Sequence, residues 1–213
     1  VQMLSSGDNY KKVFDWAGYD TLEKMRAAST EEIFGAAAAY AEATGDRATR
    51  LMTSPVVDGY VSLKSFDDAV KDGSVRNIPY MIGYTRDDMG ANINAGIDRF
   101  CALREEAGSP AFAYQFARPL PDNAEGTHDM KGAFHSSELW FMFKSLDNCD
   151  RPFTTADYDL AERMLSSWTT FAKTGAPGNG WNAWTSAAPD YMVFKLDDSG
   201  AEASSMGQPV ARE

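Results

Sequence analysis

His135 is the residue of this sequence whose type and surroundings best suit proton transfer. It is one of only two histidines in 213 residues. It follows a glycine, Gly132, at the end of a polar loop and stands at the front of an apolar, helix-like run that reaches Phe143. A neutral imidazole can accept and return a proton near pH 7, which few other side chains do unassisted. Position alone, however, fits a hydrogen-bonded structural histidine equally well.

Asp87 and Asp88 are the carboxylates best placed to work with an imidazole. They lie just beyond a short apolar run, residues 79–83, that is bounded by chain-breaking residues and therefore predicts a buried parallel strand. In open α/β sheets, catalytic groups and ligands gather beyond the carboxyl ends of such strands. For either aspartate taken singly, a solvated surface position is the commoner case.

Four segments spread along the chain carry recognisable motifs: Pro55–Gly59, Ile78–Asp88, Gly132–Leu139 and Trp168–Pro177. The segment Gly-Ala-Phe-His-Ser-Ser-Glu-Leu closely resembles the catalytic-histidine segment of the type B carboxylesterases, the family of the cholinesterases and the bacterial para-nitrobenzyl esterases. The last segment is similar to the family's Trp-x-Asn-Phe-Ala-Lys-Thr-Gly-x-Pro. One such motif would be weak evidence, but four in the family's order are strong evidence.

The resemblance implies the C-terminal part of an α/β-hydrolase fold, with a mostly parallel sheet flanked by helices. In that fold the catalytic triad runs nucleophile, acid, histidine along the chain. Alignment with the family's Gly-x-x-x-Asp-Glu places Asp88 at the acid position, where the family usually has glutamate, and makes Asp87 a structural neighbour and competing candidate. Asp88 would fix the tautomer of His135, which would then deprotonate a serine.

Residues after His135 are candidates for supporting roles. The resemblance implies that Glu138 is a buried carboxylate behind the site, whereas an exposed first-turn glutamate favoured by the helix dipole is an equally good interpretation. One or two of Trp140, Phe141 and Phe143 are expected to line an apolar substrate pocket, and core packing is expected for the others.

The sequence contains no Gly-x-Ser-x-Gly, the motif that carries the nucleophile in this fold. We therefore expect residues 1–213 to be the C-terminal segment of a single catalytic domain whose nucleophile-bearing N-terminal part is absent. A small-molecule carboxylic ester is the expected substrate, and the N-terminal portion of the same enzyme is the expected partner. The chain alone is expected to be inactive. The alternative is a catalytically inactive, cholinesterase-like module that binds proteins, although keeping both His135 and Asp88 favours the enzyme.

Composition narrows the remaining possibilities. The net charge of −11 argues against binding to nucleic acid or to an anionic membrane, and no apolar run approaches the ~20 residues needed to span a bilayer. Cys101 and Cys149 lack metal or redox spacing, so we expect free, mostly buried thiols and favour the reducing cytoplasm. His128 lies in a polar loop, and no ligand spacing supports a zinc site. No cofactor is predicted.

Local patterns predict the elements that must position these groups. Helices are expected over residues 21–28, 29–43, 65–72 and 93–107, and from the cap at Thr154–Asp157 to Gly175. The second of these begins with a capping box of Ser29 and Glu32. Residues 1–20 are expected to be irregular or a short helix, 55–63 extended with a turn at Asp58–Gly59, 111–117 a second buried strand and 191–196 an edge strand. The core face of the last helix is expected to hold Leu160, Met164, Leu165, Trp168, Phe171 and Ala172.

Overall fold

The structure, a computed structural model, describes residues 6–46, 57–88, 93–122, 125–126 and 129–212. The chain forms two compact units, Val1–Val75 and Arg76–Glu213. The motif segment Pro55–Gly59 lies partly outside the described residues, because Pro55 and Val56 are not among them.

The first unit is helical. It contains α1 (Ser6–Trp16), α2 (Leu22–Ala27), α3 (Thr30–Thr44) and α4 (Phe66–Lys71). The expected capping box is confirmed: the amide of Ser29 donates to Oε2 of Glu32 at 2.7 Å, and the amide of Glu32 donates back to Oγ of Ser29 at 3.2 Å. Gly45 then ends α3 in the left-handed conformation that glycine adopts without strain. Residues 6–16, expected to be irregular or a short helix, form three turns of helix.

The segment 55–63, expected to be extended with a turn at Asp58–Gly59, contains no strand over its described part, residues 57–63. One carboxylate oxygen of Asp58 accepts the backbone amides of Tyr60, Val61 and Ser62, each at 2.9 Å. These local hydrogen bonds satisfy amides that a strand would have to pair with another strand, so the chain turns after Asp58, where a turn was expected, and is not extended beyond it.

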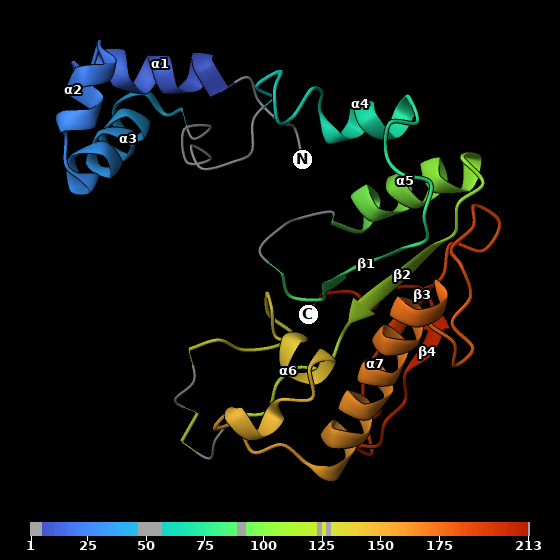
Figure 1. Cartoon of the computed structure of the whole chain (residues 1–213). Coiled ribbons are helices and arrows are strands. Elements are labelled where there is room, and N and C mark those ends of the chain that lie inside the picture. The colour runs from blue at the N-terminus through green and yellow to red at the C-terminus, as the bar shows by residue number, and fades with distance from the viewer. Residues whose placement is uncertain (1–5, 47–56, 89–92, 123–124, 127–128, 213) are drawn as a thin grey trace. The chain divides into compact units, whose positions relative to one another are not determined.

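The second unit is built on a four-stranded sheet in the order β1-β2-β3-β4. The strands are β1 (Tyr80–Thr85), β2 (Ala111–Phe116), β3 (Tyr191–Phe194) and β4 (Ser205–Gly207). The first three are parallel, and β4 runs antiparallel to β3. Helix α5 (Ile93–Glu106) joins β1 to β2, and the short α6 (Leu139–Met142), a 3₁₀ turn (Leu146–Asn148) and α7 (Thr155–Thr174) lie between β2 and β3 (Figure 1). The sequence-based fold class, a mostly parallel sheet flanked by helices, is confirmed.

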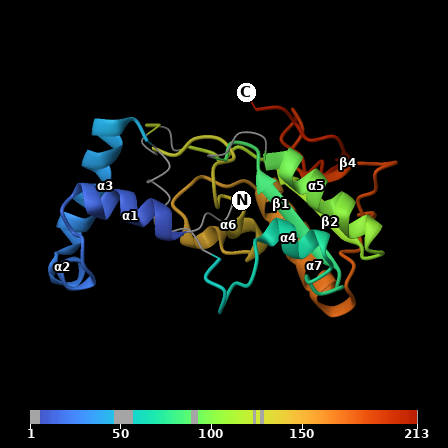
Figure 2. The ribbon, with the colours of Figure 1, turned by 90° about the horizontal axis from the view of Figure 1, so that it is seen from above.

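Alternating residues of β2 show how the sheet is covered on both faces. Phe112 and Phe116 pack in the core cluster that contains Leu160 and Met164 of α7. Ala111 and Ala113, which alternate with them, pack in the other cluster beside Ile97 and Cys101 of α5. Figure 2 shows α5 and α7 on opposite sides of these strands. The small alanines let α5 lie close to the sheet, while the bulky aromatic side chains fill the space under α7.

Helix α7 is the longest helix among the described residues of this unit. Its first turn closes a capping box in which Asp157 accepts from the Thr154 amide at 2.9 Å, and the buried Asp157 also pairs with Arg118 at 2.7 Å. Trp168 and Phe171 pack against the core as expected, but Ala172 is exposed, because the apolar stripe has rotated away from the sheet by that position.

The prediction that residues 191–196 form an edge strand is wrong about the position of this strand in the sheet. All four residues of β3 are buried, and β3 is paired on both sides because β4 covers it. The edge strands of the described sheet are β1 and β4, and the residues of β1 are mostly half-buried rather than buried as expected. Strand β4 was not predicted from the sequence, because Ser-Met-Gly is too short to show an apolar pattern.

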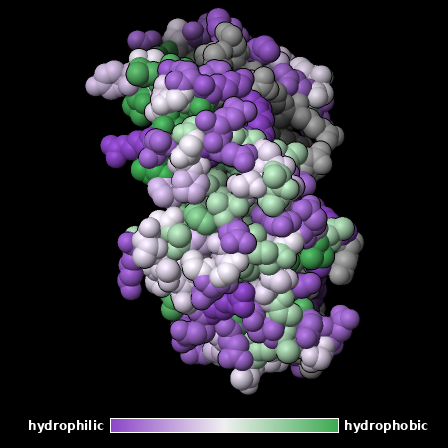
Figure 3. All heavy atoms as spheres, turned by 90° about the vertical axis from the view of Figure 1, so that its right-hand side faces the viewer, coloured by the Kyte–Doolittle hydropathy of each residue, from purple (hydrophilic) through white to green (hydrophobic). Residues whose placement is uncertain are grey.

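The character of the surface and the state of the two cysteines agree with what the composition predicts. Hydrophilic side chains occupy most of the face seen in Figure 3, with apolar side chains showing through in places. Cys101 is buried and Cys149 half-buried, and both are free thiols, as expected. No helix in the described part of the chain is long and apolar enough to cross a membrane.

Candidate active site

Asp88 lies on a tight turn at the carboxyl end of β1. The Asp88 amide donates to the carbonyl of Thr85 at 3.1 Å, and the Thr85 hydroxyl donates to Oδ2 of Asp88 at 3.3 Å. Thr85 itself is 1% exposed. The buried last residue of β1 thus fixes both the backbone and the carboxylate of Asp88. Sequence reasoning did not single out Thr85, although a hydroxyl three residues before a candidate acid is a usable signal.

Asp87 joins the turn that carries Asp88, the acid turn, to the loop that carries His135, the histidine loop. Its amide donates to the carbonyl of Ala133 at 2.9 Å, and its Oδ2 accepts the Ala133 amide at 2.7 Å. Arg86 completes the arrangement with an ion pair to Asp87 at 3.1 Å. Burial acts to raise the pKa of Asp87, but the hydrogen bonds from Arg86 and Ala133 outweigh it, so the pKa is lowered. Asp87 is therefore a carboxylate that holds two loops together and does not face His135.

The loop from β2 to His135 is pinned at several points. The Leu120 amide donates to the carbonyl of Gly132 at 3.0 Å and closes the loop. The guanidinium of Arg151, which is 8% exposed, donates to the carbonyls of Pro121 and Met130 at 2.9 and 2.8 Å. It also lies over the ring of Phe134, 5.4 Å from the ring centroid. These contacts fix the chain on which the histidine is carried.

His135 and Asp88, the two predicted site residues, lie side by side. Nδ1 of His135 is 3.1 Å from Oδ1 and 3.2 Å from Oδ2 of Asp88. The carboxylate is a hydrogen-bond acceptor, so this contact favours the tautomer with the proton on Nδ1. Nε2 has no hydrogen-bond partner within the described part of the chain, and the His135 side chain is 56% exposed. A basic nitrogen is thus presented to solvent by a ring held from behind.

Glu138 is half-buried behind this pair. Burial raises the pKa of Glu138, the positive form of His135 acts against this, and the nearby Asp88 carboxylate adds to the rise. Its Oε2 is buried without a hydrogen-bond partner among the residues that the structure describes. Of the two interpretations from sequence, the exposed first-turn glutamate does not fit, and the carboxylate behind the site does.

The aromatic residues after His135 separate into different environments. Phe141 is fully buried in the core, Trp140 packs against that core, and Phe143 is 69% exposed. His128 lies outside the described residues. Across the described ranges, no three histidine, cysteine or acidic side chains gather in a way that could hold a metal ion.

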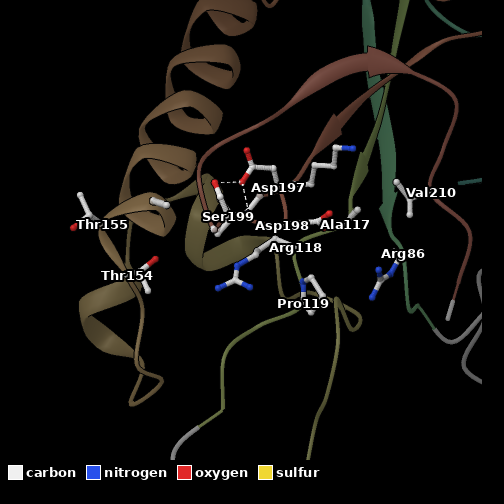
Figure 4. Close-up of a pocket in the computed structure, with 14 residues that line it drawn as sticks. Arg86, Ala117, Arg118, Pro119, Thr154, Thr155, Asp197, Asp198, Ser199 and Val210 are labelled. Carbon is white, nitrogen blue, oxygen red and sulfur yellow. Dashed lines mark hydrogen bonds between the residues drawn. The ribbon is translucent and has the colours of Figure 1, made fainter.

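A pocket of about 940 Å³ lies beyond the carboxyl ends of the strands, next to the start of α7 (Figure 4). His135 and Asp88 are not among its lining residues. Its arginines are already committed, Arg86 to Asp87 and Arg118 to Asp157, and Asp197 accepts hydrogen bonds within its own turn. We assign no ligand to this pocket, and the candidate site is the pair of His135, which is exposed, and Asp88, which is half-buried.

Gly132 is required by this arrangement. Its φ is +73°, and a Cβ at this position would lie 2.4 Å from Oδ2 of Asp87. Gly132→Ala should therefore push the Asp87 carboxylate away from Ala133, whereas Gly200→Ala, at φ +82° with open space around it, carries only the backbone strain. We expect Gly132→Ala to lower the free energy of unfolding by about 1–3 kcal/mol more than Gly200→Ala does. Urea denaturation of both variants measures this difference, and equal losses would show that the close approach to Asp87 is unimportant.

The profile of the Carboxylesterase family matches residues 90–210, more than half of the chain, a range that includes His135 and begins just after Asp88. The para-nitrobenzyl esterase of Bacillus subtilis (strain 168) is 25% identical over 222 residues, which cover 81% of this chain and 45% of that protein. The acetylcholinesterase of Leptinotarsa decemlineata is 24% identical over 106 residues, 48% of this chain and 16% of that protein.

Solved structures agree in fold. A thermophilic para-nitrobenzyl esterase matches with a TM-score of 0.65 at 18% identity, over 96% of this chain and 53% of that chain. A carboxylesterase of Geobacillus stearothermophilus matches with a TM-score of 0.63 at 19% identity, over 93% and 52%. The chain spans about half the length of the para-nitrobenzyl esterases that it matches. The fold is that of the α/β hydrolases, and the chain belongs to the carboxylesterase family.

Proposed function

We propose that this chain supplies the acid and the base of a serine carboxylesterase, with Asp88 as the orienting acid and His135 as the general base. The observation that carries the proposal is the contact between Nδ1 of His135 and Asp88 at 3.1 Å, with Nε2 exposed on the other side of the ring. A binding module gains nothing from such a pair, so the contact favours the enzyme over an inactive, protein-binding relative.

The proposed chemistry follows from proton bookkeeping. Nε2 of His135 accepts the proton of a serine hydroxyl while the serine oxygen attacks the ester carbonyl, and the Asp88 carboxylate stabilises the imidazolium that forms. The imidazolium then returns the proton to the departing alkoxide, which leaves as the alcohol. In the second half, Nε2 deprotonates a water molecule that attacks the acyl-serine, and the serine recovers its proton as the carboxylic acid leaves.

The serine must come from another part of the enzyme. The sequence has no Gly-x-Ser-x-Gly, and the chain spans about half the length of its esterase relatives. We therefore propose that residues 1–213 are the C-terminal segment of one catalytic domain, and that an N-terminal portion of the same enzyme brings the serine and the oxyanion donors. Edge strand β1, which is paired on one side only in the described sheet, is the natural place for a further strand. Uncharged carboxylic esters are the proposed substrates.

An assay of the chain with and without the N-terminal portion tests the proposal. The chain alone should not turn over an aryl ester or react with a serine-directed fluorophosphonate, because it lacks both the nucleophile and the oxyanion donors, usually the largest electrostatic contribution. Adding the N-terminal portion should restore both activities. Intact-mass analysis of the same sample controls for a second polypeptide. Ester hydrolysis by a pure, monodisperse 213-residue chain would contradict the proposal.

A further inference from the structure

The segment Gln208–Arg212 reaches the turn that carries Asp88. Nη1 of Arg212 donates to the backbone carbonyl of Asp88 at 3.1 Å, and Nη2 lies 3.5 Å from the backbone carbonyl of Asp87. The contact joins residues 124 positions apart. Figure 1 shows this end of the chain beside the carboxyl end of β1, where the acid turn begins.

The same segment is anchored to the sheet. Gln115 of β2 is 1% exposed, and its side-chain amide pairs with the backbone of Val210. Its Oε1 accepts the Val210 amide at 2.7 Å, and its Nε2 donates to the Val210 carbonyl at 2.9 Å and to the Tyr84 hydroxyl at 3.1 Å. A buried glutamine with both ends satisfied by one backbone residue holds that residue in a defined place.

A second anchor lies two residues earlier. Nε2 of Gln208 donates to the carbonyl of Pro189 at 3.2 Å and to Oδ1 of Asp190 at 3.0 Å, just before β3 begins. Figure 4 shows Val210 on the same side of the pocket as Arg86, the residue that precedes the two aspartates. Arg212 therefore starts from a fixed backbone, which lowers the entropy cost of placing its guanidinium on the acid turn.

We propose that Arg212 is a positioning residue for Asp88: its guanidinium holds the backbone carbonyls of the acid turn, so that the carboxylate stays against Nδ1 of His135. This inference rests on the proposed function, in which Asp88 orients His135. Arg212 touches neither the imidazole nor the Asp88 carboxylate in any contact seen here, and acts through the two carbonyls. A guanidinium suits this task because its planar fork carries several donors that can reach two acceptors at once.

The test compares Arg212→Gln, Arg212→Lys and a control, Arg26→Gln. Arg26 is an exposed arginine in α2, which belongs to the other compact unit, so the control makes the same change of charge outside the unit that contains the acid turn. Two readouts are needed: kcat and KM for an aryl ester in the complete enzyme, and the NMR signal of the Nδ1 proton of His135 in the chain itself. Thermal unfolding of each variant verifies that it folds.

Arg212→Gln should lower kcat by about 10-fold with KM changed by less than about 2-fold, because misplacement of a reacting group costs rate rather than binding. Its Nδ1 proton signal should exchange faster with water. Arg212→Lys should recover about half of the lost activity, since an ammonium can hold one carbonyl but not two. Arg26→Gln should match the wild type in every measurement.

Unchanged kcat and an unchanged Nδ1 proton in Arg212→Gln would overturn the inference, as would an equal effect of Arg26→Gln. If the complete protein hydrolyses no ester, the proposed function fails, but the NMR signal still decides whether Arg212 controls the contact of His135 with Asp88. The two failures are therefore distinguishable.

Discussion

His135→Ala should lower kcat for a simple aryl ester by at least about 10³-fold in the complete enzyme, because the imidazole that pairs with Asp88 is the group proposed to take the serine proton. The melting temperature should hardly change, since the side chain is 56% exposed and its described hydrogen bonds go only to Asp88. Initial rates and a thermal melt on the same preparation measure both effects.

His128→Ala is the matched control, since His128 is the other histidine of the sequence. It should keep the activity of the wild type. Retention of most of the activity in His135→Ala would remove His135 from the mechanism, and equal losses in both variants would show that neither loss is specific.

Asp88→Asn should lower kcat by about 10⁴-fold while leaving the fold intact. An asparagine can turn its NH₂ group toward Nδ1, which favours the tautomer with the proton on Nε2. His135 then presents a donor where it must accept the serine proton. Steady-state kinetics, with circular dichroism to verify folding, measure this effect.

Asp87→Asn is the comparison, because Asp87 stands next in the chain but bonds to Ala133 and Arg86. Its amide oxygen can still accept the Ala133 amide, so kcat should fall far less than in Asp88→Asn. The free energy of unfolding should drop by about 1–2 kcal/mol at neutral pH as the charged acceptor is lost. A larger loss of kcat in Asp87→Asn than in Asp88→Asn would show that the acid is Asp87.

The stability effect of Asp87 should depend on pH. Its folded-state pKa is lowered, so the carboxylate stabilises the fold above the unfolded-state pKa of about 3.9. This contribution is lost as the pH falls through the lowered folded-state pKa. The difference in unfolding free energy between wild type and Asp87→Asn should therefore be largest at neutral pH and shrink in acid. A difference that grows on acidification would contradict the assigned role.

Local sequence determined the elements that depend on neighbouring residues. The capping boxes at Ser29 and Thr154 predicted the starts of α3 and α7, because a cap needs only residues three positions apart. The apolar runs before Asp87 and after Pro110 predicted β1 and β2, because a strand of a sheet that is covered by helices on both faces is apolar on both sides. The motif around His135 predicted the family, which the Carboxylesterase profile confirmed.

Tertiary structure alone decided how these elements meet. The pairing of Asp87 with Ala133, of Gln115 with Val210 and of Arg212 with the acid turn joins residues 46, 95 and 124 positions apart. Local periodicity does not predict these contacts, because each one depends on which distant segments the folded sheet brings together. The position of β3 in the sheet likewise depends on tertiary structure: the sequence predicted an edge strand, but β4 pairs with its free side. The sequence alone identified the residues that could transfer a proton, His135 and Asp88. The distance of 3.1 Å between Nδ1 of His135 and Oδ1 of Asp88 depends on the packing of distant backbone segments, because hydrogen-bond geometry is fixed only when the segments that carry both groups are held in place.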